Sequence, residues 1–269
     1  MTRLKALKYR RRLNRKIADA LGPGAQAPKA QVDTLFRAFT PKAIDLPLIR
    51  VGGDHDGGYL VPDDLDGLEA SYSPGVAEEL DFDLEMAERG LACFLIDASI
   101  DGITTQHENI TFERLFLGAV TEGNTISLND WVMRNTPDAR DLMLQIDIEG
   151  AEYNCLSSTP RDLLNRFRII IIEFHDMHKA FAADGHAVLR ETVNKLNDTH
   201  VLCHLHHNNC LSPATYSGIA FPEIFEATYI RKDRCKQLPH EARLPHHLDQ
   251  PNLPHEIDWK LPEFWKRPG

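Results

Sequence analysis

From residue 48 onward, the hydrophobic positions alternate between short apolar runs and longer stretches with helical spacing. A short apolar run bounded by turn residues is typical of a buried strand, whereas apolar residues three and four apart predict a helix. The pattern predicts strands at residues 48–51, 59–61, 68–72, 92–96, 112–120, 142–146, 168–172, 201–203 and 223–230. It predicts helices at residues 78–89, 127–133, 152–166 and 184–197. This alternation implies an α/β fold, in which a parallel sheet carries helices on both faces.

Polar side chains follow three of the predicted strands at the point where each strand ends. The run 142–146 continues into Asp147 and Glu149, and the run 168–172 continues into Glu173 and His175. The run 201–203 continues into the His- and Asn-rich stretch 204–209. Open α/β sheets bind ligands beyond the carboxyl ends of their strands, so these side chains predict a site. The alternative for Asp147 and Glu149 is that they only cap the next helix.

Length and composition predict one α/β domain with an extension at each end. The 269 residues divide into a basic helical extension and linker (1–45), a main domain (46–235) and an irregular Pro- and His-rich extension (236–269). No apolar run approaches the ~20 residues that span a bilayer, and no signal-peptide pattern follows the basic start. The five cysteines form no CxxC pair, which favours free thiols and a cytoplasmic protein.

Charge is unevenly distributed along the chain. Residues 1–16 hold eight Lys or Arg and no acid, although the net charge of the whole chain is −10. A basic helix over about residues 5–21 could contact the inner membrane surface, a polysaccharide or a partner subunit, or could simply pack by its apolar stripe. The acidic remainder argues against nucleic-acid binding. The oligomeric state stays open.

The turn after the strand 68–72 indicates what kind of cofactor the sheet could bind. This turn has one glycine, Gly75, and two acids, Glu78 and Glu79, so it disfavours the pyrophosphate of NAD. The earlier turn from Gly53 to Gly58 lacks the lysine of a phosphate-binding loop, which disfavours ATP. S-adenosylmethionine has a positive sulfonium and no phosphate, and therefore suits an acidic turn. Asp97, about 20 residues further on, would accept its ribose hydroxyls, or is an ordinary loop acid.

Several stretches together resemble the FkbM-type S-adenosylmethionine-dependent methyltransferases, especially the branch found in bacterial surface-polysaccharide clusters. The matching stretches, in family order, are residues 50–52, 56–59, 72–83, 97–102, 147–152, 172–175, 204–209 and 228–232. The resemblance implies a Rossmann-like class I methyltransferase, with a seven-stranded, mostly parallel sheet whose last strand is antiparallel. It also implies methyl transfer to a hydroxyl, often that of a sugar. Pro74 and the pair Ala98-Ser99 depart from the usual family pattern.

By position, the resemblance implies a set of cofactor-binding residues. They are Ser73, Gly75, Glu78, Asp81, Asp97, Ala98, Gly118, Ala119 and Asp147. Gly75 would let the backbone approach the methionine end of the cofactor, and Glu78 or Asp81 would hold its ammonium group. Gly118 and Ala119 would border the adenine. Asp147 would face the transferred methyl group.

Methyl transfer to a sugar hydroxyl requires activation of a weak nucleophile by a general base or a metal ion. The candidate bases are His175 and His206, and Asp147 lies beside them as a further catalytic candidate. A divalent metal ion, Mg or Mn, could instead be held by Asp147, Glu173 and His206. Purely structural histidines are the third alternative.

The sequence therefore predicts an O-methyltransferase that uses S-adenosylmethionine on a hydroxyl of a sugar or glycan. Two alternatives stay open. One is a metal-dependent hydrolase built on the Asp, Glu and His cluster. The other is a non-catalytic module of a glycan-assembly complex, docked through its basic helix.

Overall fold

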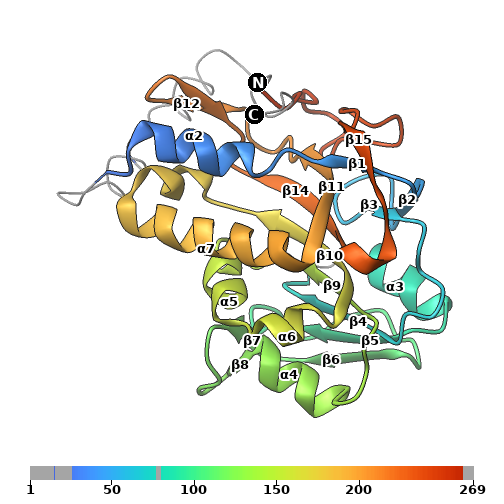
Figure 1. Ribbon diagram of the computed structural model, residues 1–269. Helices are drawn as coiled ribbons and strands as arrows, with labels where there is room; N and C mark the ends of the chain where they lie inside the picture. Colours follow the sequence, from blue (N-terminus) through green and yellow to red (C-terminus); the bar gives the residue numbers. More distant parts are fainter. Residues whose placement is uncertain (1–14, 16–25, 77–79, 263–269) are drawn as a thin grey trace.

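The computed structural model describes Arg15 and residues 26–76 and 80–262, and it confirms the predicted fold class. A seven-stranded sheet has the order β11-β14-β10-β9-β4-β5-β6 (Figure 1). Its strands are β4 (Ala70–Pro74), β5 (Ala92–Ile96), β6 (Ile110–Glu113), β9 (Leu142–Ile146), β10 (Phe167–Phe174), β11 (His200–His207) and β14 (Phe225–Arg231). Only β14 runs antiparallel to its neighbours within this sheet. The strand of this sheet that comes last in the sequence, β14, is thus the reversed one, as expected.

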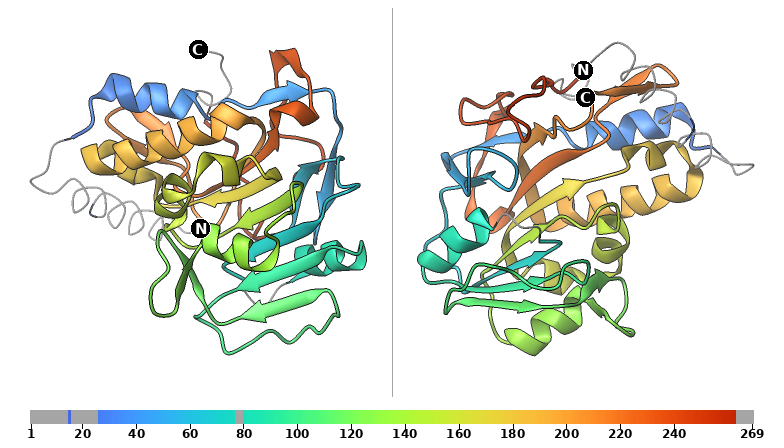
Figure 2. Two further views of the ribbon diagram at one scale, coloured as in Figure 1. Left: turned by 60° about the horizontal axis from the view of Figure 1, so that its bottom comes forward. Right: turned by 180° about the vertical axis from the view of Figure 1, so that it is seen from behind.

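Each face of the sheet has its own apolar core. The larger core lies under five helices: α2 (Lys29–Arg37), α4 (Leu128–Asn135), α5 (Glu152–Ser158), α6 (Arg161–Leu164) and α7 (Ala183–Thr199). The smaller core lies under α3 (Asp81–Glu88) and the hairpin of β2 (Leu48–Val51) and β3 (Tyr59–Pro62). Figure 2 shows these two layers from further directions. No helix in the described ranges has both the length and the apolar character needed to cross a membrane.

The central strand β10 shows how the sequence builds both cores at once. Successive side chains of a strand point to opposite faces, so Ile170, Ile172 and Phe174 join the larger core. Ile169 and Ile171 join the smaller core. Glu173 continues this second set, which places a carboxylate on the face covered by the β2–β3 hairpin.

Shorter elements complete the fold. Besides the β2–β3 hairpin, the described residues form two 3₁₀ helices, η1 (Met177–Phe181) and η2 (Lys232–Arg234), and three further two-stranded sheets. The small sheets pair β1 (Lys42–Ile44) with β15 (Gln237–Glu241), β7 (Phe116–Gly118) with β8 (Thr125–Ser127), and β12 (Ala214–Tyr216) with β13 (Ile219–Phe221). Residues of both predicted extensions pack on the main body, because α2 and Leu261 contribute to the larger core, and β1 and β15 join the two extensions. The predicted basic helix over residues 5–21 lies outside the described residues, apart from Arg15.

Two predicted elements were wrong as single units. The predicted strand 112–120 is two strands, because the chain turns at Leu115, whose N–H donates to the Glu113 carbonyl. The predicted helix 152–166 is split into α5 and α6 at Pro160. Proline supplies no N–H to continue a helix and pushes the preceding Thr159 into an extended conformation, with ψ 131°.

The order of the strands creates a crevice beyond the carboxyl ends of β4 and β9. After β4 the chain continues to β5 and β6 on one side, whereas β9 and β10 lie on the other. Such a reversal is where open α/β sheets bind their ligands. Gly75 closes β4 at φ +83°, and a Cβ added there would lie 1.5 Å from the backbone oxygen of Asp147. Only glycine allows this close approach.

We expect Gly75→Ala to destabilise the protein more than Gly90→Ala. Gly90 also has a positive φ, +91°, but a Cβ there would meet nothing within 4 Å. Gly90→Ala should cost only the conformational term, about 1–2 kcal/mol, whereas Gly75→Ala adds a backbone clash. Urea unfolding of both variants measures the difference. Equal losses of unfolding free energy would show that the chain does not make this contact.

Candidate active site

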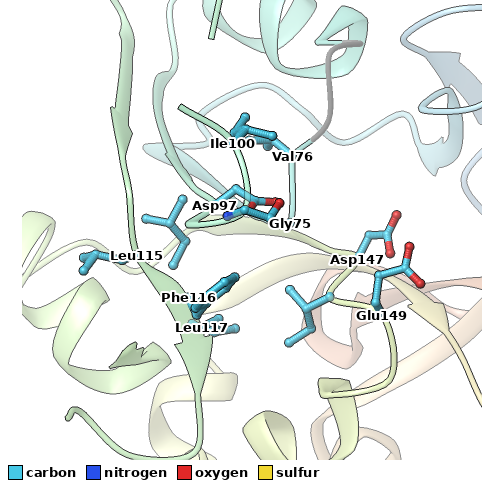
Figure 3. A pocket seen from close by; sticks show the side chains of 12 residues that line it. Gly75, Val76, Asp97, Ile100, Leu115, Phe116, Leu117, Asp147 and Glu149 are labelled. Carbon is cyan, nitrogen blue, oxygen red and sulfur yellow. The ribbon is translucent and has the colours of Figure 1, made fainter. Parts of the chain in front are cut away.

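A cavity of about 410 Å³ opens at the crevice between β4 and β9. Its lining residues are Gly75, Val76, Ile96, Asp97, Ser99, Ile100, Leu115, Phe116, Leu117, Asp147, Ile148 and Glu149. Figure 3 shows Asp97 beside Gly75 on one side, Phe116 on another, and Asp147 and Glu149 together on a third. A volume of this size falls in the range of roughly 300–1,000 Å³ that is usual for small-molecule sites.

The structure brings three of the predicted cofactor-binding residues to this cavity: Gly75, Asp97 and Asp147. Asp97 lies directly after β5, and its Oδ1 accepts a hydrogen bond of 2.6 Å from the N–H of Ser99. The wall beyond β6 is formed by Leu115, Phe116 and Leu117, which the sequence analysis did not single out.

Of the other predicted cofactor-binding residues, Glu78 lies outside the described residues. The remaining ones do not line this cavity. Ser73 donates a 2.5 Å hydrogen bond to the buried Asp83, and Asp81 lies 3.7 Å from the imidazole of His55. Gly118 ends β7, where an added Cβ would meet Thr125 at 2.3 Å. Ala98 and Ala119 neighbour lining residues without being among them.

A second, smaller cavity of about 70 Å³ adjoins the first. Its lining residues are Asp56, Gly57, Tyr59, Gly75, Val76, Phe82, Asp83, Gln145 and Asp147. Gly75, Val76 and Asp147 border both cavities. Asp83 is the buried acid here: desolvation raises its pKa to about 7, although the hydrogen bond from Ser73 opposes the shift. The carboxylate of Asp147 therefore stands at the junction of the two spaces.

Strand register places a polar row next to this junction. Glu173 of β10 is paired with Glu226 of β14, and Glu226 is paired with His206 of β11. Asp147 follows Ile146 of β9, which pairs with Ile172. Asp147, Glu173, Glu226 and His206 thus lie side by side across four neighbouring strands, on the face that the β2–β3 hairpin covers.

His175 is surrounded by acids. Its Nδ1 lies 3.1 Å from Glu152 Oε1, and its Nε2 lies 3.6 Å from Glu149 and 3.8 Å from Asp147. Burial opposes the charged form of the ring, but Glu152, Asp147 and Glu149 raise the pKa of His175 to about 9. The imidazole is therefore protonated at neutral pH.

The acids of the row have raised pKa values. Burial, the largest effect, raises the pKa of Asp147 to about 7, with help from Glu149 and Glu152 and against the charge of His175. Burial together with Asp147, Glu226 and Asp56 raises the pKa of Glu173 well above its usual range.

His206 resembles His175 in its charge state. Its Nδ1 lies 3.2 Å from Glu226 Oε2. Burial opposes protonation, but Glu226, Asp249 and Asp258 raise the pKa of His206 to about 9. Both candidate histidines therefore hold protons rather than accept them at neutral pH.

The residues predicted to hold a metal ion are divided between neighbouring groups. Within the described residues, ligand atoms close enough to share one ion occur in the groups Asp147–Glu149–His175, Asp56–Glu173–Glu226 and Asp176–His178–Glu223. Asp147 and Glu173 thus fall in different groups, and His206 adjoins the second through Glu226.

Several site residues escaped the sequence analysis. Asp56 lies in the turn between β2 and β3 and Asn252 in the C-terminal extension, and only folding brings the Asn252 amide within 2.8 Å of Asp56. Glu226 was hidden because β14 is reversed, so that its beginning lies at the functional edge. The alternating pattern of residues 223–230 was the only available signal.

The fold, the reversal of strand order and the cavity beyond Gly75 define a Rossmann-like methyltransferase architecture. Residues 96–199 match the family model of the methyltransferase FkbM domain, in agreement with the resemblance seen in the sequence. No curated protein matches the chain significantly. The match supports a methyltransferase; the polysaccharide branch stays a prediction.

We expect His175→Gln to destabilise the protein in a pH-dependent way. Because the folded pKa of about 9 exceeds the ordinary 6.5, the stabilisation by His175 is complete below pH 6.5 and is lost as pH rises through 9. Removing one partner of a buried charged pair should cost about 3 kcal/mol below pH 6.5. Unfolding midpoints of variant and wild type across this range measure the effect.

His200→Gln is the matched control. Burial lowers the pKa of His200 to about 4, so its contribution is present above pH 6.5 and is lost as pH falls toward 4. A pH-independent difference between His175→Gln and the wild type would contradict the assigned charge of His175.

Proposed function

We propose that the chain is an S-adenosylmethionine-dependent O-methyltransferase that acts on a hydroxyl of a sugar or glycan. One observation carries the proposal: Gly75, Val76 and Asp147 border both the larger and the smaller cavity. A donor in the larger cavity and an acceptor hydroxyl in the smaller one would meet beside Asp147. When bound, the cofactor supplies an electrophilic methyl group on a positively charged sulfur.

The lining of the larger cavity fits this cofactor. Asp97, Asp147 and Glu149 contribute carboxylates, and no Lys or Arg is among the lining residues. Such a lining attracts a cationic molecule and repels phosphates. Leu115 and Phe116 offer an apolar wall for a planar base, and Asp97 lies at the strand tip where an acid can accept ribose hydroxyls.

Asp147 is the general base of the proposed reaction. A base works best when its pKa lies near the operating pH, and the pKa of Asp147 is about 7. His175 and His206 are protonated at that pH, so they balance the charge of the carboxylates. Glu173, Glu226 and His206 are buried beneath the β2–β3 hairpin, and their burial strengthens these interactions.

The acceptor side suits a neutral polyhydroxyl compound. Three acids, Asp56, Asp83 and Asp147, line the smaller cavity together with Gln145 and Tyr59. These groups form hydrogen bonds with hydroxyls, whereas they would repel an anionic acceptor. We propose a sugar or glycan acceptor on this basis. We also propose a cytoplasmic location, with the basic residues 1–16 in contact with an anionic surface.

Binding of S-adenosylhomocysteine tests the cofactor assignment directly. Isothermal titration should detect sub-millimolar affinity in the wild type. Asp97→Asn should weaken it about 10- to 100-fold, because a charged hydrogen bond contributes about 1.5–3 kcal/mol. Asp101→Asn, at a fully exposed neighbouring acid paired with Arg114, is the control and should leave affinity unchanged. Absence of binding to the wild type, with turnover of phosphoesters instead, would favour the hydrolase.

The pH dependence of methyl transfer tests Asp147. The rate should rise through about pH 7, as Asp147 loses its proton, and fall through about pH 9, as His175 becomes neutral. Asp147→Asn should lower the rate about 10²- to 10⁴-fold, the usual contribution of a general base. Its affinity for S-adenosylhomocysteine, which has no sulfonium charge, should change little. A variant that keeps the wild-type rate and its rise near pH 7 would exclude Asp147 as the base.

A further inference from the structure

The second acidic group, Asp56, Glu173 and Glu226, gathers more negative charge than the protein neutralises. Carboxylate oxygens of all three lie within 4.8 Å of one another. Their hydrogen-bond partners are uncharged amides, from Asn208 to Glu173 and from Asn252 to Glu226 and Asp56.

Two imidazolium rings adjoin the group: His206 lies 3.2 Å from Glu226, and His175, which the first acidic group shares, lies 3.7 Å from Glu173. When the three carboxylates are ionised, their negative charge exceeds the positive charge of the adjoining rings, and such a group attracts a cation.

Two buried polar atoms beside this group have no partner. Asn252 is 4% exposed, and its Oδ1 makes no hydrogen bond, although the Nδ2 of the same amide contacts Asp56 at 2.8 Å and Glu226 at 2.5 Å. His206 is 8% exposed, and its Nε2 is also without a hydrogen-bond partner. Leaving a buried polar atom unpaired costs about 1–3 kcal/mol, which is unusual in a finished native site.

We propose that Asp56, Glu173 and Glu226, together with the side-chain amide of Asn252, bind one hard divalent cation. A half-turn of the Asn252 amide exchanges Nδ2 for Oδ1 and directs a fourth oxygen toward Asp56 and Glu226. Oxygen ligands at this spacing suit Mg²⁺, Mn²⁺ or Ca²⁺.

The other two acidic groups each include a histidine, whereas the group of Asp56, Glu173 and Glu226 consists of carboxylates alone. In the group of Asp147 and Glu149, the protonated His175 supplies the positive charge, and the side chain of Glu149 is 87% exposed. In the third group, both oxygens of Glu223 accept hydrogen bonds from His178, and Lys179 pairs with Asp176. The cation therefore belongs to the group that contains Glu226.

The place of the cation suggests its role, which rests on the proposed function. Asp56 lines the smaller cavity, so an ion bound there has one side toward the acceptor. A hard cation binds adjacent hydroxyls through their oxygens and makes them more acidic. The site would orient a sugar diol for removal of its proton by Asp147.

Mn²⁺ titration of the full chain without cofactor, followed by electron paramagnetic resonance, tests the site. One saturable site with sub-millimolar affinity is expected, and Mg²⁺ or Ca²⁺ should compete for it. Glu226→Gln should weaken Mn²⁺ binding at least about tenfold, since it removes a charged ligand. Glu149→Gln, which alters the neighbouring acidic group, should leave the affinity unchanged.

Asn252→Asp is the complementary variant, because it adds a carboxylate instead of removing one. It should bind Mn²⁺ more tightly than the wild type and show a larger rise in unfolding temperature when the ion is added. This variant decides the question if Glu226→Gln fails to fold. Unchanged Mn²⁺ affinity in Asn252→Asp would overturn the proposal.

Two further results would also overturn it: no saturable Mn²⁺ site in the wild type, or loss of Mn²⁺ binding in Glu149→Gln with normal binding in Glu226→Gln. Titration of S-adenosylhomocysteine into the same preparation separates this inference from the proposed function. Cofactor binding without ion binding would contradict the cation site alone. Ion binding without cofactor binding would contradict the methyltransferase proposal.

Discussion

The contact between the turn at Gly75 and the backbone of Asp147 is the constraint on which the active site depends. An added Cβ at Gly75 would lie 1.5 Å from the Asp147 oxygen, so the ends of β4 and β9 are as close as a backbone allows. This closeness brings one carboxylate to the border of two cavities. Wider separation of the two strands would leave a donor pocket and an acceptor pocket without a common wall.

A second constraint follows from placing a polar row on a buried sheet face. The apolar side chains of the smaller core stop where Glu173 and Glu226 begin, and the β2–β3 hairpin takes over the cover. Hydrogen bonds from Gln145 to the Tyr59 hydroxyl and from Thr228 to the Leu60 carbonyl fasten the hairpin to the sheet. Buried carboxylates are tolerated only where hydrogen-bond donors, such as the amides of Asn208 and Asn252, or opposite charges, such as His175, compensate their desolvation.

Much of the architecture could be predicted from local sequence because it depends on local patterns. Apolar runs specified the central strands, and the acids after them marked the edge where Asp97 and Asp147 line one cavity. The split at Pro160 was equally visible in the sequence but was overlooked.

The rest depends on tertiary packing, which no local pattern encodes. The charge of His175 follows from acids supplied by residues 147–152, and the contact between Asp56 and Asn252 spans most of the chain. The division of the acids into separate groups likewise follows from strand register, which places Glu226 between Glu173 and His206.

The C-terminal extension makes completion of the polar row depend on a segment that is synthesised after the strands of the sheet. The Asn209 side chain forms two hydrogen bonds with the backbone of Leu253. These bonds position the neighbouring Asn252, whose amide donates to Asp56 and Glu226. During synthesis, the strands of the seven-stranded sheet leave the ribosome before residues 252–253 do. Until residues 252–253 dock, Asp56 and Glu226 therefore lack the amide donor of Asn252, and the polar row stays open to water.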